Sequence, residues 1–236
     1  MAVFLRRAST SAGLGRNGAS TLQYLLVLDF EATCWESGTR KNQEIIEFPT
    51  LLYDIKEKSV QATFHKYVRP LQDPKLSEFC MELTGISQET VDDAEPFPSV
   101  WRSFHSFLER HEVFKDPSAY SFLCCGDWDI RSMLPTQLAY EASVFKDPDA
   151  LQVQLLRPPL GDRWINIKKV LQKRHQLKHA KGMMGMLSRL GISHEGRHHS
   201  GIDDARNIAR IVQKMQEDGW KPSPQDFTWM SGSPRT

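Results

Sequence analysis

The hydrophobic pattern of the chain predicts a β-rich opening. Residues 24–28 are continuously apolar, as in a strand that is buried on both faces of a sheet. A second apolar run at 45–52 contains Pro49, which favours a bulge or a sheet edge. After a turn at 54–59, apolar and polar residues alternate through 60–66, the pattern of a half-exposed strand. We therefore expect a three-stranded meander.

The remainder of the chain alternates between helical and strand-like patterns. Pro135 is expected to kink one helix or to lie at its start, and Gly191 is expected to end another. Asp203 is a good N-cap residue for the last helix. The predicted helices cover residues 100–108, 130–140, 183–190 and 203–218, and the predicted strands cover 121–125 and 164–167.

This order of elements predicts an α/β domain with a ribonuclease H-like layout, which is a mixed five-stranded sheet with helices on both faces. A chain of 236 residues can bury a sizeable core. We expect the domain to span residues 23–220, between a flexible leader (1–22) and a loose C-terminal tail (221–236). Turn-forming residues at 141–162 predict a surface insertion.

Composition and charge are compatible with an enzyme that acts on nucleic acid. Apolar residues make up 40% and charged residues 25% of the chain, which is ordinary for a globular protein. No apolar run approaches the roughly 18 residues of a membrane span, so we expect no membrane partner. The net charge is +1, so a nucleic-acid enzyme would need a local basic surface. The four cysteines form no Cys-x-x-Cys pair, which argues against zinc, and Cys124 and Cys125 are expected to be core thiols.

The first 28 residues contain no Asp or Glu and carry Arg6, Arg7 and Arg16. This composition is compatible with a mitochondrial transit peptide, and the alternative is a leader with no targeting role. Nothing resembles a secretory signal, and the cysteine usage favours a reducing compartment. We expect an intracellular protein that is cytoplasmic, nuclear or mitochondrial.

Four acidic residues are placed where they can meet. Asp29 and Glu31 end the first apolar strand and leave it on the same face, because they are two residues apart. Asp129 follows the strand at 121–125, and Asp204 opens the last helix. If the two strands are adjacent and parallel, these carboxylates converge. Burying unpaired carboxylates costs several kcal/mol, and divalent cations would relieve their mutual repulsion.

Oxygen ligands favour Mg²⁺, for which Mn²⁺ can substitute. Two such ions, roughly 3.5–4 Å apart, would activate water and stabilise the leaving oxygen of a phosphodiester. His199, five residues before Asp204, could accept the proton of the water near neutral pH. Each residue also has an ordinary interpretation, such as a helix cap or a surface histidine. Their joint order and spacing favour metal-dependent phosphodiester cleavage that releases nucleoside 5′-monophosphates.

The motifs resemble those of the 3′ histone mRNA exonuclease, or enhancer-of-RNA-interference, family, which belongs to the DEDDh 3′-5′ exonucleases. The resemblance runs from about Tyr24 to Gly219. It rests on Asp-Phe-Glu-Ala-Thr-Cys (29–34), Glu-Ile-Ile-Glu-Phe-Pro (44–49), Leu-Thr-Gly-Ile (83–86), Gly-Asp-Trp-Asp (126–129), Trp-Ile-Asn-Ile (164–167) and His-Ser-Gly-Ile-Asp-Asp (199–204).

This resemblance implies that Asp29, Glu31, Asp129 and Asp204 are the metal ligands and that His199 is the general base. Glu31 would bridge metal and substrate. The residues implied to contact the terminal nucleotide are Phe30, Glu31, Ala32, Leu83, Thr84, Trp128 and His199. Trp128 could stack on a base, and its alternative interpretation is a core tryptophan.

A basic stretch is the best candidate for phosphate contacts. Residues 163–194 contain no Asp or Glu, and the residues we expect to contact phosphates are Lys168, Lys169, Lys173 and Arg174. The alternative is a solvated helix face. The stretch lacks a base-reading motif, so we expect weak sequence preference.

The resemblance predicts a 3′-5′ exoribonuclease for single-stranded or 3′-overhanging RNA, acting in RNA 3′-end trimming or small-RNA turnover. Its protein partners are not indicated. The alternatives are a DNA or dual-specificity exonuclease and a catalytically silent RNA-binding protein. Some family members carry a separate N-terminal nucleic-acid-binding module, and about two dozen residues before the first strand are too few for one. We therefore expect no tight recognition of a structured hairpin.

Overall fold

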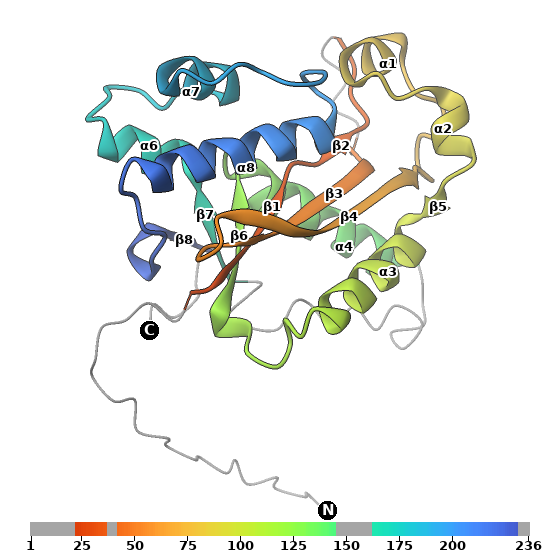
Figure 1. The fold of residues 1–236 in the computed structure, drawn as a ribbon. Coiled ribbons are helices and arrows are strands. Elements are labelled where there is room, and N and C mark those ends of the chain that lie inside the picture. Colours follow the sequence, from red (N-terminus) through yellow and green to blue (C-terminus); the bar gives the residue numbers. More distant parts are fainter. Residues whose placement is uncertain (1–21, 37–41, 145–161, 231–236) are drawn as a thin grey trace, which may run out of the picture.

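The computed structural model describes residues 22–36, 42–144 and 162–230, and it consists of one mixed sheet with helices on both faces (Figure 1). The α/β architecture predicted from the sequence is therefore confirmed. The predicted leader, most of the predicted insertion and the end of the predicted tail (1–21, 145–161 and 231–236) lie outside the described residues. Among the described helices, none combines the length and apolar character that a membrane crossing requires.

The five predicted strands form the middle of the sheet, in the order β4-β3-β1-β6-β7. β1 pairs antiparallel with β3 and parallel with β6. Within the described residues, short strands extend this core: β5 lies beyond β4, β8 lies beyond β7, and β2 pairs with β3. The strands are β1 (Tyr24–Leu28), β2 (Glu31–Ala32), β3 (Ile45–Asp54), β4 (Ser59–Arg69), β5 (Glu95–Pro96), β6 (Tyr120–Cys124), β7 (Arg163–Asn166) and β8 (Phe227–Trp229).

The helices cover both faces of this sheet, with α3 and α4 on one face and α6, α7 and α8 on the other (Figure 1). The α-helices are α1 (Glu78–Thr84), α2 (Gln88–Asp92), α3 (Phe97–Arg110), α4 (Leu134–Val144), α6 (Ile167–Arg174), α7 (Met183–Leu190) and α8 (Gly201–Glu217). Gly191 ends α7 in the left-handed conformation, as predicted.

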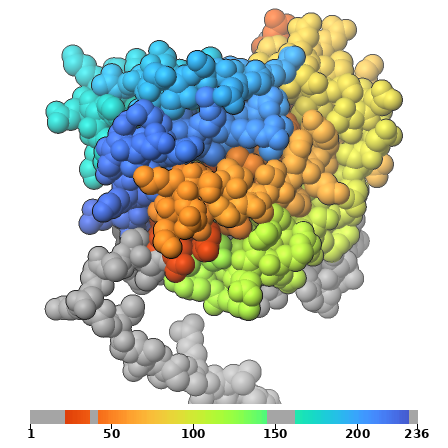
Figure 2. All heavy atoms as spheres, viewed as in Figure 1, coloured from red at the N-terminus to blue at the C-terminus, as the bar shows by residue number. Residues whose placement is uncertain are grey.

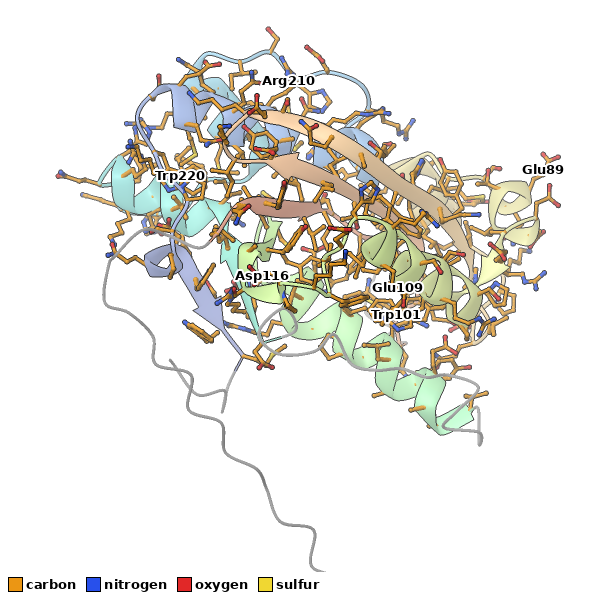
Figure 3. All side chains as sticks on the ribbon, turned by 60° about the horizontal axis from the view of Figure 1, so that its bottom comes forward. Glu89, Trp101, Glu109, Asp116, Arg210 and Trp220 are labelled. Atoms are coloured by element: carbon orange, nitrogen blue, oxygen red, sulfur yellow. The ribbon has the colours of Figure 1, made fainter. Side chains whose placement is uncertain are left out.

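Two predictions about the sheet were wrong. The tail after Pro222 is not uniformly loose, because β8 pairs antiparallel with β7. The indole of Trp220 is buried and donates a hydrogen bond to Asp226, which fixes the chain between α8 and β8 (Figure 3). Pro49 does not mark an edge, since β3 lies between β1 and β4. Pro49 lies between Thr50, the last residue of β3 that pairs with β1, and Glu47, which pairs with β2, so it falls at an interruption of the ladder on that side of β3.

The helix predicted at 130–140 has a different start from the one expected. A π-helical turn at Asp129–Met133 precedes α4. Pro135 lies in the first turn of α4, where a residue without an N–H is tolerated. Asp129 is the first residue of the π-helical turn, so it lies at the start of the helical segment rather than inside a regular helix. π-helical turns occur frequently at functional sites.

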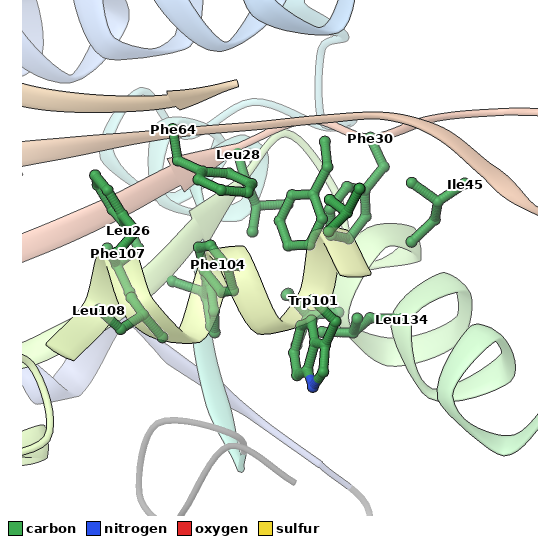
Figure 4. Packing of buried hydrophobic residues seen from close by; sticks show 14 of the residues in the cluster. Leu26, Leu28, Phe30, Ile45, Phe64, Trp101, Phe104, Phe107, Leu108 and Leu134 are labelled. Carbon is green, nitrogen blue, oxygen red and sulfur yellow. The ribbon is translucent and has the colours of Figure 1, made fainter. Parts of the chain in front are cut away.

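Alternation along β1 divides the core into two layers. Leu26 and Leu28 face α3 and α4, whereas Leu25 and Val27 face α6, α7 and α8. Aromatic rings fill the first layer, with Phe104 of α3 near its centre (Figure 4). The ring centroid of Phe104 lies 4.7 Å from that of Phe48 and 5.2 Å from that of Phe64. Asp29 and Glu31 continue the odd-numbered positions of β1 and therefore face α8.

Phe104→Ala should lower the free energy of unfolding by about 3–5 kcal/mol, because it removes a fully buried ring from a rigid layer. Urea denaturation followed by circular dichroism measures this loss. The control is Val144→Ala at an exposed position of α4, which should change the stability by less than about 0.5 kcal/mol. Equal effects of the two substitutions would contradict the assignment of the core.

Candidate active site

The four predicted acids meet at the C-terminal ends of the central strands β1 and β6. β1 and β6 are parallel, so their C-terminal ends lie side by side and deliver Asp29 and Asp129 to the same place. Glu31 lies in β2, and Asp204 lies in the first turn of α8, which packs on β1 and β3. Carboxylate oxygens of Asp29, Glu31 and Asp204 lie within 4.8 Å of one another.

Asp129 is fixed to this group through the backbone. The N–H of Phe30 donates a hydrogen bond of 2.9 Å to its Oδ1. Phe30 lies between Asp29 and Glu31 in the chain, so the bond holds the end of β6 against the segment that carries both acids. Glu31, Asp129 and Asp204 are nearly inaccessible to solvent.

Burial and mutual repulsion make the ionised forms of these acids unfavourable. The pKa of Asp29 lies well above its usual range because of burial and the charges of Asp129 and Glu31. Burial, followed by the charge of Glu47, raises the pKa of Glu31 to about 9. Burial also raises the pKa of Asp129 to about 6, and that of Asp204 above its usual value. The protein alone therefore supplies too little positive charge for this site.

The donor set fits divalent cations. Every member is a carboxylate, the ligand type that hard cations prefer. Asp204 Oδ1 is buried and receives no hydrogen bond from any described residue, so its lone pairs are available to a ligand. His194 Nε2 lies 3.8 Å from this oxygen, which is too far for a hydrogen bond. The structure thus brings together the residues that could hold a metal.

His199 lies at the rim of this cluster in an unusual conformation. Its φ is 66°, in the left-handed region, and its N–H donates to Asp204 Oδ2 at 3.0 Å. Its ring stacks on His198, with centroids 3.9 Å apart. Burial, followed by the charge of His198, lowers the pKa of His199. The imidazole is therefore neutral near neutral pH and able to accept a proton.

A fifth carboxylate, Glu47 of β3, was not assigned a role by the sequence analysis. It is fully buried and accepts the N–H groups of Gly201 and Ile202 at 2.9 and 3.0 Å. Its Oε1 also lies 2.8 Å from Nε2 of His65. These two N–H groups belong to the start of α8, so Glu47 caps the helix from β3, the strand on which α8 packs. A single acid inside the otherwise apolar run 45–53 was the available signal.

The expected N-cap Asp203 is not the cap. α8 begins at Gly201, and the N-cap residue Ser200 makes no side-chain capping bond. Asp203 instead accepts the N–H of Arg197 and a guanidinium bond from Arg206. It therefore shapes the loop before the helix rather than closing the helix end.

Only part of the predicted nucleotide-contacting set is open to solvent. The ring of Phe30 is buried edge-on against Phe48 in the core, so its side chain cannot line the site. Thr84 is buried, and its hydroxyl donates to the carbonyl of Cys80 at the end of α1. Ala32 is buried as well, whereas Leu83 is half-buried. The contacts implied for Phe30 and Thr84 therefore need their backbone rather than their side chains.

Trp128 is 39% exposed, so the alternative interpretation as a core tryptophan was wrong. It directly precedes Asp129 in the chain, and its side chain is exposed. Cys124 is buried as predicted, and Cys125 is half-buried.

The predicted phosphate-contacting residues divide into two groups. Lys169 is engaged by Asp127, with 2.6 Å between Nζ and Oδ2, and Arg174 donates to the carbonyl of Asp218. Lys168 and Lys173 lie on the same helix, α6, with Lys173 exposed. Lys168 is half-buried, and its charge acts on the thiol of Cys125, which follows β6.

Arg197 joins the histidine loop to the end of α1. Its guanidinium donates to the carbonyl of Glu82, and it packs beside Gly85, which has a φ of 76°. The segment 83–86 and the loop that carries His199 are thereby held as neighbouring walls of the site.

Comparison with known proteins follows this geometry. A family model described as Exonuclease (RNase_T) matches residues 26–212. The chain is 38% identical to ERI1 exoribonuclease 2 of Danio rerio, over 91% of this chain and 39% of that protein. It is 36% identical to 3′-5′ exoribonuclease 1 of Homo sapiens, over 85% of this chain and 54% of that protein. The chain thus spans about two fifths and about half of the length of these two curated relatives.

A solved structure shares the fold. The nuclease domain of 3′hExo, described as a DEDDh family member bound to rAMP, matches with a TM-score of 0.74 and 35% identity. The match covers 84% of this chain and 94% of that one. It confirms the predicted ribonuclease H-like layout.

Gly201→Ala should disturb the acidic cluster. A Cβ at this position would lie 2.7 Å from the carbonyl oxygen of Asp29, a backbone atom, so the start of α8 would have to move away from the end of β1. We expect the stability to fall by about 1–3 kcal/mol and the rise in Tm on adding Mn²⁺ to shrink. Differential scanning fluorimetry measures both effects. Gly182→Ala, where no atom lies within 4 Å, is the control, and an unchanged response of Gly201→Ala would contradict the predicted contact.

The stability of the metal-free protein should fall as pH rises. Glu31 has a pKa of about 9 in the folded protein and an ordinary value of 4.5, so between these values the unfolded chain releases a proton that the folded chain retains. The free energy of unfolding should fall by up to about 1.4 kcal/mol per pH unit from this group. Urea denaturation in EDTA from pH 5 to 9 measures the slope. Glu31→Gln should flatten it, and so should saturating Mg²⁺; an equal slope in all three samples would contradict the prediction.

Proposed function

The chain belongs to the exonuclease family that includes these DEDDh proteins, and on this premise we propose that it removes nucleotides one at a time from the 3′ end of RNA. The observation that carries the proposal is the convergence of four carboxylates, three of them buried, beside a histidine whose pKa is lowered. The names of the relatives, exoribonuclease 2 and 3′-5′ exoribonuclease 1, support the direction of cleavage and the RNA substrate.

The metal ligands in this proposal are Asp29, Glu31, Asp129 and Asp204, and the ions are two Mg²⁺, for which Mn²⁺ can substitute. When bound, such ions supply the Lewis acidity that activates water and stabilises the leaving oxygen. The raised pKa values of the four acids show that the carboxylates lack positive charge in the protein alone, which is the charge that bound cations would supply.

His199 is the general base in this proposal. Its lowered pKa keeps the ring able to take a proton from the attacking water. Asp204 accepts the N–H of His199 and offers its free Oδ1 to a cation. One carboxylate thereby sets the distance between the base and the metal-binding group.

The substrate is single-stranded or 3′-overhanging RNA. The backbone of Ala32 and the partly exposed Leu83 would border the terminal nucleotide, and Trp128 would stack on a base, a contact worth roughly 1–3 kcal/mol. Lys168 and Lys173 are the better candidates for phosphate contacts on α6, because Lys169 and Arg174 already have protein partners.

A 5′-labelled single-stranded RNA of about 20 nucleotides tests the proposal. With Mg²⁺, we expect a ladder that shortens from the 3′ end and releases nucleoside 5′-monophosphates, and no product in EDTA. Asp29→Ala should abolish cleavage while the circular dichroism spectrum is retained. Cleavage at internal positions, or wild-type activity of Asp29→Ala, would contradict the proposal. Equal rates on the matched DNA strand would remove the RNA preference while leaving the metal site.

His199→Ala should lower the rate by roughly 10²–10⁴ at neutral pH, since the variant lacks the general base. Single-turnover kinetics on the same RNA measure the chemical step. His198→Ala is the matched control, because it removes the stacked neighbour and keeps the base. If the two variants lost similar activity, the general base would have to be another group.

A further inference from the structure

A second group of metal-ligating side chains lies beside the catalytic acids. His198, His199 and Asp204 each place one ligand atom, a ring nitrogen or a carboxylate oxygen, within 4.8 Å of the others. The catalytic group contains Asp29, Glu31 and Asp204 at the same spacing, so Asp204 is common to both groups. The two groups therefore differ in chemistry, since one consists of carboxylates and the other contains two imidazoles.

The two imidazoles of the second group are held side by side. Their ring centroids lie 3.9 Å apart, and the ring planes differ by 28°. His199 has a left-handed backbone, with a φ of 66°, and its N–H donates to Asp204 Oδ2 at 3.0 Å. One hydrogen bond thereby ties the backbone of the histidine pair to the carboxylate of the same group.

The loop that carries both histidines is fixed to α8 and α1. Asn207 of α8 accepts the N–H of Glu195 at 3.1 Å and donates to the carbonyl of Glu195 at 2.7 Å. Asp203 accepts the N–H of Arg197 at 3.0 Å, and the guanidinium of Arg197 donates to the carbonyl of Glu82. Ligands that are fixed in advance lose less conformational entropy when an ion binds.

Two buried polar atoms at this place lack hydrogen bonds. Asp204 Oδ1 and His194 Nε2 lie 3.8 Å apart, and neither has a hydrogen-bond partner among the described residues. The ring of His194 also lies edge-on to that of His198, with centroids 6.0 Å apart. An unpaired oxygen and an unpaired ring nitrogen so close together indicate a place for a ligand that bonds to both kinds of atom.

The second group is open to solvent on one side. His198 is exposed, and His199 is half-buried. In Figure 2, the blue segment that contains α7 and α8 adjoins the yellow segment that contains α1 on the surface of the molecule. An ion can therefore reach His198 directly from solvent.

The donor set of the second group favours a different ion from that of the carboxylates. Imidazole nitrogens suit Zn²⁺, Cu²⁺ and Ni²⁺, whereas carboxylates suit Mg²⁺ and Mn²⁺. Two histidines and one carboxylate, with a position left for water, are a common ligand set for Zn²⁺. The cysteine spacing argues against a zinc site made of thiols, but this group uses imidazole nitrogens instead.

We propose that His198, His199 and Asp204 bind a Zn²⁺ ion that inhibits the enzyme. A neutral imidazole has one free lone pair, so an ion bound to His199 leaves none for the proton of the attacking water. The ion also engages Asp204, which the catalytic cations need. The inhibition rests on the proposed function, whereas the binding of Zn²⁺ does not.

Isothermal titration calorimetry with ZnCl₂ tests the binding apart from activity. The parent protein is Asp29→Ala, which removes a ligand of the carboxylate group and none of the histidine group. Adding His198→Ala should weaken Zn²⁺ binding at least about tenfold. Adding His179→Ala, which removes an exposed histidine outside the group, should leave it unchanged. Absence of Zn²⁺ binding to the parent up to about 100 µM, or equal affinity with and without His198→Ala, would overturn the proposal.

Inhibition is measured on the 5′-labelled RNA in excess Mg²⁺, with each rate expressed relative to that of the same variant without Zn²⁺. We expect Zn²⁺ to inhibit the wild type and His179→Ala alike, and His198→Ala to need at least about ten times more Zn²⁺ for half-inhibition. An unaltered rate in Zn²⁺ would overturn the proposal, and so would equal inhibition of His198→Ala, which would place the inhibitory ion among the carboxylates. Inactivity of the wild type in Mg²⁺ alone would contradict the proposed function instead, and the calorimetry would still decide the zinc site.

Discussion

The contact between Glu47 and the start of α8 is the constraint on which the site depends. α8 carries Asp204, whereas Asp29 and Glu31 belong to the sheet, so the acids meet only if the helix is docked at one position. The carboxylate of Glu47 accepts the N–H groups of Gly201 and Ile202 and fixes that position. Gly201 has no side chain, which allows the helix end to approach the carbonyl of Asp29. A helix N-terminus also favours a negative charge.

The same docking concentrates negative charge. Glu47 has compensating partners in the helix N-terminus and His65, but the four other acids have few. Their raised pKa values show that the metal-free folded protein relieves this repulsion by retaining protons that free carboxyl groups would lose. Natural proteins commonly accept such a cost at functional sites. Here the cost is linked to cation binding, because divalent cations would replace the retained protons and compensate the charges of the grouped carboxylates.

The sequence alone predicted those parts of the structure that depend on the local pattern of apolar and polar residues. Continuous apolar runs predicted β1, β3 and β6, and an apolar strand ending in Asp29 and Glu31 indicated chemistry, because no core strand gains stability from such an end. The convergence with Asp129 and Asp204 could be inferred from strand order and from the family motifs. The roles of these residues remain predictions that the proposed experiments test.

Other features depended on contacts between distant segments. Phe30 stands between two ligands in the chain, yet alternation turns its ring into the aromatic core. Asp203 is a residue type that is common at the N-cap, but Glu47 of β3 caps α8 instead. β8 has three residues, which is too few for an alternating apolar-polar pattern to be recognised. It forms by pairing antiparallel with β7. In each case the residue or strand that determines the structure is far away in sequence, so the local pattern of apolar and polar residues does not predict the contact.

The central claim is that the docked helix and the sheet form a ready-made site for two cations. Anomalous diffraction from crystals grown with Mn²⁺ tests it most directly. The account predicts two anomalous peaks, roughly 3.5–4 Å apart, within bonding distance of the carboxylates of Asp29, Glu31, Asp129 and Asp204. Peaks elsewhere, or carboxylates that stay free at saturating Mn²⁺, would contradict it.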